Sequence, residues 1–269
     1  MSVFREGIAN TFRNYFTDEN QREYFRLLFR WGKHKRYKVV PGVRFLDYSL
    51  IVPDLLTFLG QFDEIFLKQS YNFETSDSDP IIIDCGANIG MSCLYFKRMW
   101  PKSRIVAFEA DPNLFSILEK NLVENGIRDI QLMNKAVWVD GGPVMFSVEG
   151  ADGGSIYGTD NLVQVQTIRL KEFLGKFKAV NLLKIDIEGA EDRVILDCAE
   201  QLDRVENIFI EYHSWKGKEQ RLGEVLAVLE SNKFRYRLES TVNGKAPLLN
   251  RLVESPMDVH VNIYGFREK

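Results

Sequence analysis

The sequence predicts an α/β fold, in which a mostly parallel sheet is covered by helices on both faces. The first observation is an alternation of strand and helix patterns that runs from residue 81 to the end of the chain. The second is a pair of short apolar runs, at 81–83 and 180–185, which predict strands buried inside the sheet. The length of 269 residues suffices for one large α/β domain, or for one domain with a small appendage.

The first fifty residues differ from the remainder, so we divide the chain into an N-terminal helical, basic segment (1–50) and a main domain (51–269). Apolar side chains within 20–31 recur at a helical spacing. The segment is rich in cations, namely Arg22, Arg26, Arg30, Lys33, Lys35, Arg36 and Lys38. One interpretation is a patch that contacts an anionic membrane surface or a phosphorylated substrate. The other is a solvated helix face that covers part of the main domain.

Composition is that of an ordinary soluble globular protein. With a net charge of -3, the protein as a whole is not electrostatically attracted to nucleic acid. The three cysteines, Cys85, Cys93 and Cys198, lack paired spacing, which argues for a reducing compartment and against a disulfide framework or a zinc site. The sequence shows neither a signal-peptide core nor a run of about 18 apolar residues. We therefore expect a cytoplasmic protein without a membrane span.

Two elements are expected between the basic segment and the sheet. The stretch 43–52, "VRFLDYSLIV", predicts a short strand or a hairpin. The stretch 53–69, "PDLLTFLGQFDEIFLKQ", predicts a helix that begins at Pro53 and Asp54.

From residue 81 onward, strands and helices follow one another. Strands are expected within 81–90, 104–112, 130–138, 180–187, 205–213, 234–240 and 259–266. Helices are expected within 91–100, 112–126, 170–177, 189–202 and 222–232. A two-stranded excursion, 143–148 with 163–170, surrounds the glycine-rich loop 149–161. That loop is either a lid that contacts substrate through Ser155 or Tyr157, or a plain solvent loop.

Ligands of such sheets bind at the carboxyl ends of the strands, near a topological switch point. The residues that end the predicted strands are polar or small: Asp84-Cys85-Gly86, Glu109-Ala110-Asp111, Asn134, Asp186-Ile187-Glu188 and Glu211-Tyr212-His213. A purely structural protein has no reason to end five buried strands in this way.

The loop after the first of these strands bears on the cofactor. A nicotinamide fingerprint requires G-x-G-x-x-G, but Asn88 and Met91 stand where its second and third glycines belong. S-adenosylmethionine has no phosphate; an acid such as Asp84 can interact with its amino group, directly or through water. Glu109, at the end of the next strand, can accept both ribose hydroxyls, as the corresponding acid does in NAD enzymes. Two features favour S-adenosylmethionine: the motif begins with an acid, Asp84, and two glycines of the nicotinamide fingerprint are missing. The structural alternative for Asp84 and Glu109 is helix capping.

Five motifs, "IIIDCGANIG", "VAFEADP", "NKAVW", "LLKIDIEGAE" and "IFIEYH", resemble in order and spacing the FkbM family of S-adenosylmethionine-dependent methyltransferases. The resemblance covers roughly 62–215. It implies the class I methyltransferase sheet, with seven strands and the last one antiparallel. It also implies O-methylation of a sugar, a polyketide or another secondary metabolite.

Cofactor-binding residues are expected along the same strand ends. They are Asp84, Gly86, Ala87, Asn88, Gly90, Glu109, Ala110, Asn134, Ala136 and Asp186, with Asn134 and Ala136 near the adenine. The family resemblance adds Tyr71, near the methionine part of the cofactor.

His213 is the candidate general base, because it is the histidine that follows a core strand and imidazole accepts protons near neutral pH. Glu211 or Asp186 is expected to orient it, and Asp186 and Glu188 are expected to face the cavity together. Asp186, Glu211 and His213 alternatively suit a divalent cation such as Mg²⁺ or Mn²⁺. Glu191 and Asp192 are expected to be ordinary first-turn acids of a helix, and His34 and His260 to be structural.

Two rival functions remain open at this point: a dinucleotide-dependent oxidoreductase and an RNA methyltransferase. The strand end "DIEGAE" lacks the prolines of amino-group base methylases, which argues against that subclass. The expected substrate is a small molecule or a carbohydrate.

Overall fold

The computed structural model describes residues 18–150, 154–240 and 257–268. Its centre is a seven-stranded sheet with the order β12-β13-β11-β10-β3-β4-β5. The strands are β3 (Ile81–Cys85), β4 (Arg104–Phe108), β5 (Ile130–Met133), β10 (Val180–Ile185), β11 (Val205–Trp215), β12 (Arg235–Ser240) and β13 (Met257–Phe266). Only β13 runs antiparallel to its neighbours, β11 and β12. This arrangement confirms the predicted α/β fold with seven strands, and the last strand is antiparallel as the resemblance implied.

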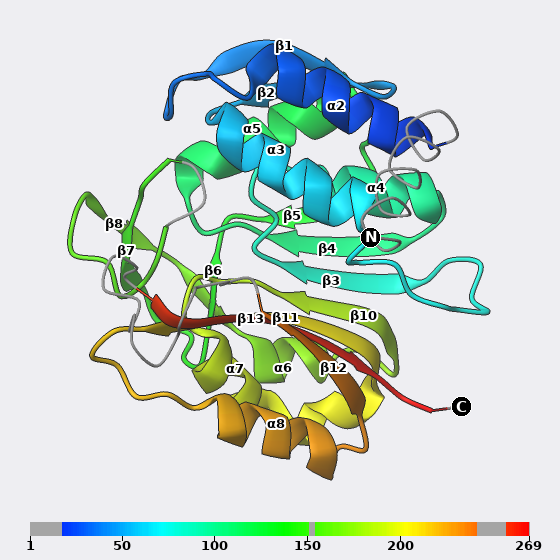
Figure 1. The fold of residues 1–269 in the computed structure, drawn as a ribbon. Coiled ribbons are helices and arrows are strands. Elements are labelled where there is room, and N and C mark those ends of the chain that lie inside the picture. Colours follow the sequence, from blue (N-terminus) through cyan, green and yellow to red (C-terminus); the bar gives the residue numbers. More distant parts are fainter. Residues whose placement is uncertain (1–17, 151–153, 241–256, 269) are drawn as a thin grey trace, which may run out of the picture.

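Helices cover both faces of the sheet (Figure 1). One face carries α3 (Leu55–Phe62), α4 (Met91–Met99) and α5 (Pro112–Glu124), and the other carries α6 (Leu170–Leu174), α7 (Glu191–Cys198) and α8 (Leu222–Ser231). A 3-10 helix, η2 (Ala199–Arg204), extends α7. The two apolar cores lie between the sheet and these helix layers. The strand ends are thus held by two packed layers, which fixes the positions of the residues that follow them.

The N-terminal segment packs onto the first helix layer. It consists of α2 (Glu19–Trp31) and a hairpin of β1 (Val40–Phe45) and β2 (Tyr48–Val52). Leu27 and Phe45 are fully buried in the same core as α3 and α4. The described part of the segment therefore shares its core with the main domain, and the predicted division at residue 50 falls inside β2.

One predicted strand is divided in two. The stretch 130–138 forms β5 in the main sheet and then β6 (Ala136–Trp138), which pairs outside it with β9 (Thr167–Arg169). The break comes at Asn134, whose side-chain amide donates to the backbone oxygens of Glu109 and Ala110. The chain turns there instead of continuing in β5. The predicted two-stranded excursion is present as β7 (Val144–Ser147) with β8 (Leu162–Val165). Its second strand, predicted over 163–170, is shorter than expected, because residues 167–169 form β9 and pair with β6 instead.

The helix predicted from Pro53 begins as expected, with Asp54 accepting hydrogen bonds from the amides of Leu56 and Thr57. It changes after Phe62 into a π-helical turn, η1 (Asp63–Leu67). Such turns are frequent at functional sites. Here the turn carries Glu64, whose carboxylate accepts a 2.6 Å hydrogen bond from Asn262 on β13.

The described helices are all too short or too polar to cross a lipid bilayer.

Candidate functional site

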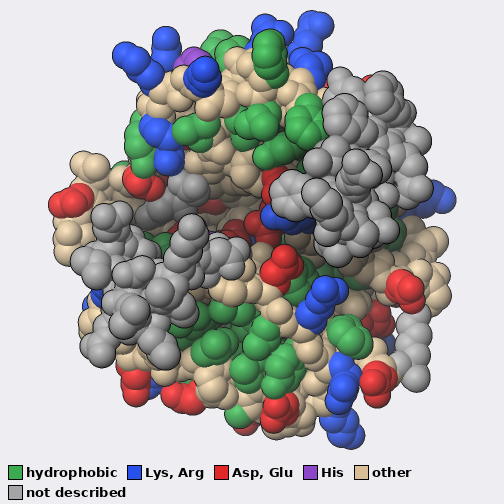
Figure 2. All heavy atoms as spheres, in the orientation of Figure 1, with side chains coloured by type: hydrophobic (Ala, Val, Ile, Leu, Met, Phe, Trp, Pro, Cys, Tyr) green, Lys and Arg blue, Asp and Glu red, His purple; other side chains and the backbone are tan. Residues whose placement is uncertain are grey.

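Two adjoining cavities lie at the carboxyl edge of the parallel strands. The first is lined by residues that follow β4, β5 and β10, including Glu109, Ala110, Asp111, Ala136 and Ile187. The second has a volume of 590 Å³ and is lined by Glu64, Tyr71, Glu211, His213 and His260, among others. Both cavities share Gln61, Gly86, Asn88, Asp186 and Glu188. The described surface is hollowed at its centre, where acidic side chains are visible in the depth (Figure 2). Two ligands in these cavities would meet beside Asp186.

The loop after β3 passes very close to the end of β10. A Cβ atom on Gly86 would lie 1.8 Å from the backbone oxygen of Asp186, and its φ of +92° is one that side chains rarely adopt. Gly86 and Ala87 donate their amides to the oxygen of Phe108, which ties this loop to β4. Gly90 adopts φ +98° at the start of α4. Gly86 thus lets the loop cross the end of β10 and lines both cavities. Gly90 lines neither cavity, and its lack of a Cβ atom makes room for Leu118.

Glu109 lies in the first cavity with both carboxylate oxygens oriented. One oxygen accepts from the amide of Asn88 and the other from the amide of Asp111, each at 2.8 Å. Burial raises the pKa of Glu109 to about 7. Ala136 lines this cavity, whereas Asn134 does not; it holds the backbone of Glu109 and Ala110 from outside.

Asp84 lies beneath the cavities rather than on their surface. Its carboxylate accepts from the hydroxyl of Ser92 at 2.5 Å, and it lies 3.2 Å from Nζ of Lys184. Lys184 also lies 3.4 Å from Asp186 and donates to the oxygen of Gly86. The side chain of Asp84 lines neither cavity. Asp84 therefore pairs with Lys184, and its interaction with the amino group of the cofactor, directly or through water, stays a prediction.

Lys184 is the buried cation of this strand end. Burial opposes its charge, but the carboxylates of Asp84 and Asp186 outweigh that effect and hold its pKa above the ordinary value. Its ammonium also lies 5.6 Å from the centre of the Tyr71 ring. Tyr71 is buried and lines the second cavity.

His213 is oriented by Glu191, not by Glu211 or Asp186 as the sequence suggested. Nδ1 of His213 lies 3.1 Å from Oε1 of Glu191, a carboxylate with no exposed surface. Glu191 also accepts hydrogen bonds from the amides of Ile187 and Gly189. Glu191 does begin α7, as predicted, but its side chain turns inward instead of facing solvent. Nε2 of His213 lies 3.9 Å from Glu188 and also 3.9 Å from Glu211.

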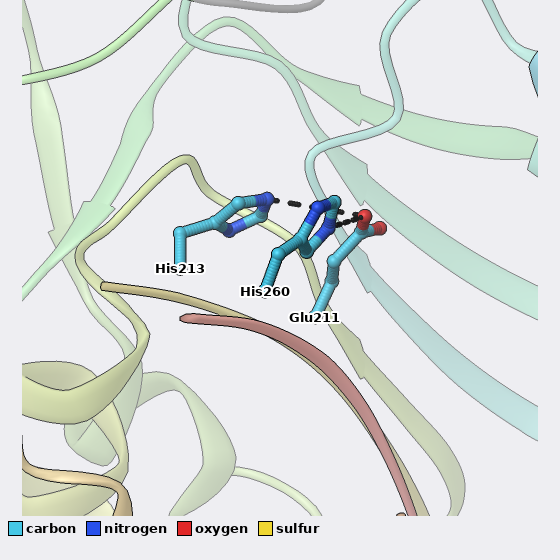
Figure 3. Close-up of side chains that lie close together, drawn as sticks. All are labelled: Glu211, His213 and His260. Atoms are coloured by element: carbon cyan, nitrogen blue, oxygen red, sulfur yellow. Dashed lines mark hydrogen bonds and ion pairs between the residues drawn. The ribbon is translucent and has the colours of Figure 1, made fainter. Parts of the chain in front are cut away.

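His260 joins the site from β13, opposite His213 in the register of β11 and β13. Its Nε2 lies 2.5 Å from Glu211, and the rings of the two histidines have centroids 4.6 Å apart (Figure 3). His260, which was expected to be structural, thus lines the second cavity. Glu64 of η1 lines the same cavity.

The second cavity carries an excess of carboxylates. Burial together with the charge of Glu211 raises the pKa of Glu64 to about 7, and the same two causes raise that of Asp186 to about 6. Burial raises the pKa of Glu188 well above its ordinary value. Although burial opposes a charged imidazole, Glu191 and Glu188 hold the pKa of His213 well above 6.5. The crowded carboxylates of Glu64, Asp186 and Glu188 therefore hold protons more tightly than they would in water, and a cationic ligand would relieve their repulsion.

Two groups of three residues could hold a metal ion. The first is Glu211 with His213 and His260, and the second is Asp186 with Glu188 and His213. Within each group the ligand atoms lie within 4.8 Å of one another. The predicted set of Asp186, Glu211 and His213 is therefore neither of these groups. His213 belongs to both, whereas Glu211 belongs to the first and Asp186 to the second.

The glycine-rich loop reaches the site, although residues 151–153 lie outside the described part. The hydroxyl of Ser155 donates to the oxygen of Glu188 at 2.7 Å, and Ile156 lines the first cavity. Tyr157 lines neither cavity and packs near Trp138.

Sequence reasoning missed Glu64 and His260, which line the second cavity, and Glu191, which orients His213 from beneath it. A signal existed for Glu191, because its motif "IDIEGAE" follows a buried strand. Glu64 and His260 are far from the strand ends in sequence, and only the η1 turn and the antiparallel β13 bring them in.

The described residues suit S-adenosylmethionine. A Cβ atom has no room at Gly86, the buried Glu109 lines the first cavity, and Asp186 and Glu188 line the junction of the two cavities.

Comparisons with known proteins agree with this chemistry. The profile of the methyltransferase FkbM domain matches residues 84–236. Methyltransferase 1 of Beauveria bassiana is 31% identical over 204 residues, which cover 65% of this chain and 80% of that protein. The 2-O-methyltransferase NoeI of Sinorhizobium fredii is 26% identical over 196 residues, covering 64% and 80%. The 31-O-demethyl-FK506 methyltransferase FkbM of Streptomyces tacrolimicus is 26% identical over 209 residues, covering 64% and 78%.

Proposed function

Because this chain belongs to the FkbM methyltransferase family and is an S-adenosylmethionine-dependent enzyme, we propose that it methylates a hydroxyl group of a sugar, glycan or secondary metabolite. The family assignment decides against a dinucleotide-dependent oxidoreductase. The observation that carries the proposal is the pair of cavities that meet at Asp186: one has the features of a cofactor site, and the other has a base at its wall.

The first cavity is the proposed cofactor site. Glu109 would accept the ribose hydroxyls, Ala110 and Ala136 would flank the adenine, and the backbone of Gly86 would pass close to the methionine part. When bound, S-adenosylmethionine supplies an electrophilic methyl group on a cationic sulfur. The carboxylates of Asp186 and Glu188 are placed to offset that charge at the junction of the cavities.

The second cavity is the proposed acceptor site. Its wall offers carboxylates and imidazoles that can hydrogen-bond a polyhydroxylated molecule. Two relatives support methylation at oxygen, since NoeI is named a 2-O-methyltransferase and FkbM acts on 31-O-demethyl-FK506. The positioning of acceptor and donor for in-line displacement is the main task of such a site.

His213 is the proposed general base. With Nδ1 fixed by Glu191, its Nε2 faces the cavity and is the nitrogen that can take the hydroxyl proton. The carboxylates around His213 raise its pKa, so the imidazole is a stronger base than usual. A cationic ligand beside Asp186 and Glu188 counteracts that rise, so the loaded enzyme has the proton-free imidazole available at a lower pH.

A divalent cation is the second candidate for activation, and one observation favours it. Glu211, His213 and His260 present ligand atoms within 4.8 Å of one another. Two imidazoles and one carboxylate suit Mn²⁺ or another transition metal better than Mg²⁺, which prefers oxygen ligands. A cation held there would lower the pKa of a bound hydroxyl.

The test combines turnover with ligand binding. We expect His213→Ala to lower methyl transfer from S-adenosylmethionine by about 10²- to 10⁴-fold, while calorimetry shows nearly unchanged affinity for S-adenosylhomocysteine. His34→Ala is the control and should behave as the parent. Full activity of His213→Ala refutes the base assignment, and tight NAD binding without S-adenosylhomocysteine binding refutes the function.

The metal candidate separates from the base candidate by its readouts. A bound cation predicts loss of activity after chelation, restoration by Mn²⁺, and loss of Mn²⁺ binding in His260→Ala. A metal-free base predicts activity that withstands chelation.

A further inference from the structure

We propose that the basic segment of residues 24–46 docks the protein on an anionic lipid surface. This segment contains seven cationic residues and no Asp or Glu, in a chain whose net charge is -3: Arg26, Arg30, Lys33, Lys35, Arg36, Lys38 and Arg44. Charge is therefore segregated, and a locally basic surface is attracted to a negatively charged membrane even when the whole protein is acidic.

The helix α2 presents a defined outer face. Leu27 is fully buried against the core. At 100° per residue, Arg22 and Phe29 fall on the opposite side of the helix, and both are exposed. Lys33 follows the helix in the turn after Gly32 and is exposed as well. Phe29 is the most exposed of the large hydrophobic residues in the described ranges, with 97% of its surface accessible to solvent. The face away from the core thus combines cations with an aromatic side chain.

More apolar side chains lie among the cations. Leu28 is 41% exposed, Tyr37 54% and Val39 57%. Cations combined with exposed aromatic and aliphatic groups are typical of a segment that lies in the interface of a bilayer. The aliphatic Leu28 and Val39 favour lipid over nucleic acid, because bases stack on aromatic rings and gain little from aliphatic groups.

Much of the positive charge is not neutralised within the protein. Arg26 pairs with Glu23 and Arg36 pairs with Asp54. Lys33, Lys35 and Lys38 make no ion pair with any residue of the described ranges. Figure 2 shows Lys and Arg side chains gathered at the end of the molecule where α2 and β1 lie. These charges are available for lipid phosphates.

The basic segment also borders the second cavity. Arg36 and Tyr37 line that cavity, and the hydroxyl of Tyr37 donates to Glu149 at 2.8 Å. A lipid surface held by Lys35 and Lys38 would therefore lie beside the mouth of the cavity. The orientation of the enzyme on the surface follows from this adjacency.

The test is sedimentation of the full chain with vesicles of phosphatidylcholine alone, or with about 30% phosphatidylglycerol added. We expect binding to the anionic vesicles and its weakening by NaCl. Replacing Lys33, Lys35 and Lys38 by Gln should lower the partition coefficient about 100-fold, at roughly one kcal/mol for each cation. Phe29→Ala should lower it about ten-fold.

Matched controls distinguish a specific face from general charge. The control residues are Lys102, Lys176 and Lys178. They are exposed in the loops that precede β4 and β10, at the amino ends of these strands, whereas the cavities lie at the carboxyl ends. Replacing these three by Gln, or the exposed Leu238 by Ala, should leave vesicle binding unchanged. Equal loss in both triple variants, or no binding to anionic vesicles, overturns the proposal. Salt-dependent RNA binding that outcompetes the vesicles and needs the same lysines also overturns it.

Discussion

Glu191 and His213 form one hydrogen-bonded unit, with Oε1 of Glu191 3.1 Å from Nδ1 of His213. The same carboxylate accepts the backbone amides of Ile187 and Gly189 and so joins the end of β10 to β11. The unit is buried, and the free side of the imidazole, Nε2, lies toward Glu188 and Glu211. A side chain at the start of a helix thus fixes the orientation of a ring on a neighbouring strand.

Glu191→Gln tests this unit. An amide keeps the shape but cannot balance an imidazolium, so we expect turnover to fall by about 10²- to 10⁴-fold with nearly unchanged affinity for S-adenosylhomocysteine. The pH profile of turnover should move to lower pH, because loss of the negative charge lowers the pKa of His213. Asp192→Asn, one residue away, is the control. A profile that does not move in Glu191→Gln would contradict the coupling.

Gly86→Ala tests the crossing of the glycine loop over β10. The added Cβ atom would meet the oxygen of Asp186 at 1.8 Å, and the backbone there has φ +92°. We expect a loss of at least about 2 kcal/mol in the free energy of unfolding, together with weaker S-adenosylhomocysteine binding. Gly223→Ala, in α8 and with nothing within 4 Å of the added atom, should cause no loss. Denaturant unfolding measures both, and equal stability of both variants would rule out the clash.

Lys184→Met tests the buried charges beneath the site. It leaves Asp84 and Asp186 without their cation, and we expect a destabilisation of about 3–5 kcal/mol. Adding Asp84→Asn to Lys184→Met should recover part of that loss, because one uncompensated charge is removed with it. Denaturant unfolding of the parent, Lys184→Met, Asp84→Asn and the double variant completes the cycle. An additive double variant would show that Lys184 and Asp84 do not interact.

Glu64→Gln tests the protonated carboxylate in η1. Burial and the charge of Glu211 raise the pKa of Glu64 to about 7 from the ordinary 4.5, so the folded state binds this proton more tightly than the unfolded state. The stabilisation is fully present below pH 4.5 and is lost as the pH rises through about 7. Relative to the parent, Glu64→Gln should therefore gain thermal stability as pH rises across this window.

The control for that experiment is Glu119→Gln, an exposed acid on α5. Melting temperatures of the three proteins, recorded without ligand between pH 4.5 and 7.5, give the comparison. A constant difference between Glu64→Gln and the parent across the range would show that Glu64 does not titrate there.

The sequence alone determined the sheet and the residues at its edge. Short apolar runs, Gly86 after the first strand and acids at 109, 186, 188 and 211 are local signals, because strand burial and tight turns constrain the residues that form them. These signals sufficed to predict the α/β fold, the family and a set of site residues, most of which line one of the two cavities.

Tertiary structure decided which of these residues meet. Asp84 pairs with the buried Lys184, and the side chain of Glu191 points inward to His213. His260 and Glu64 reach the second cavity from β13 and η1. The sequence places Glu191 near the end of a buried strand, but it does not show which partner each of these residues has, because the pairings depend on strand register, on a helical irregularity or on which of several nearby carboxylates lies closest. Distances between charges that are remote in the chain are fixed by packing, and packing is a property of the whole fold.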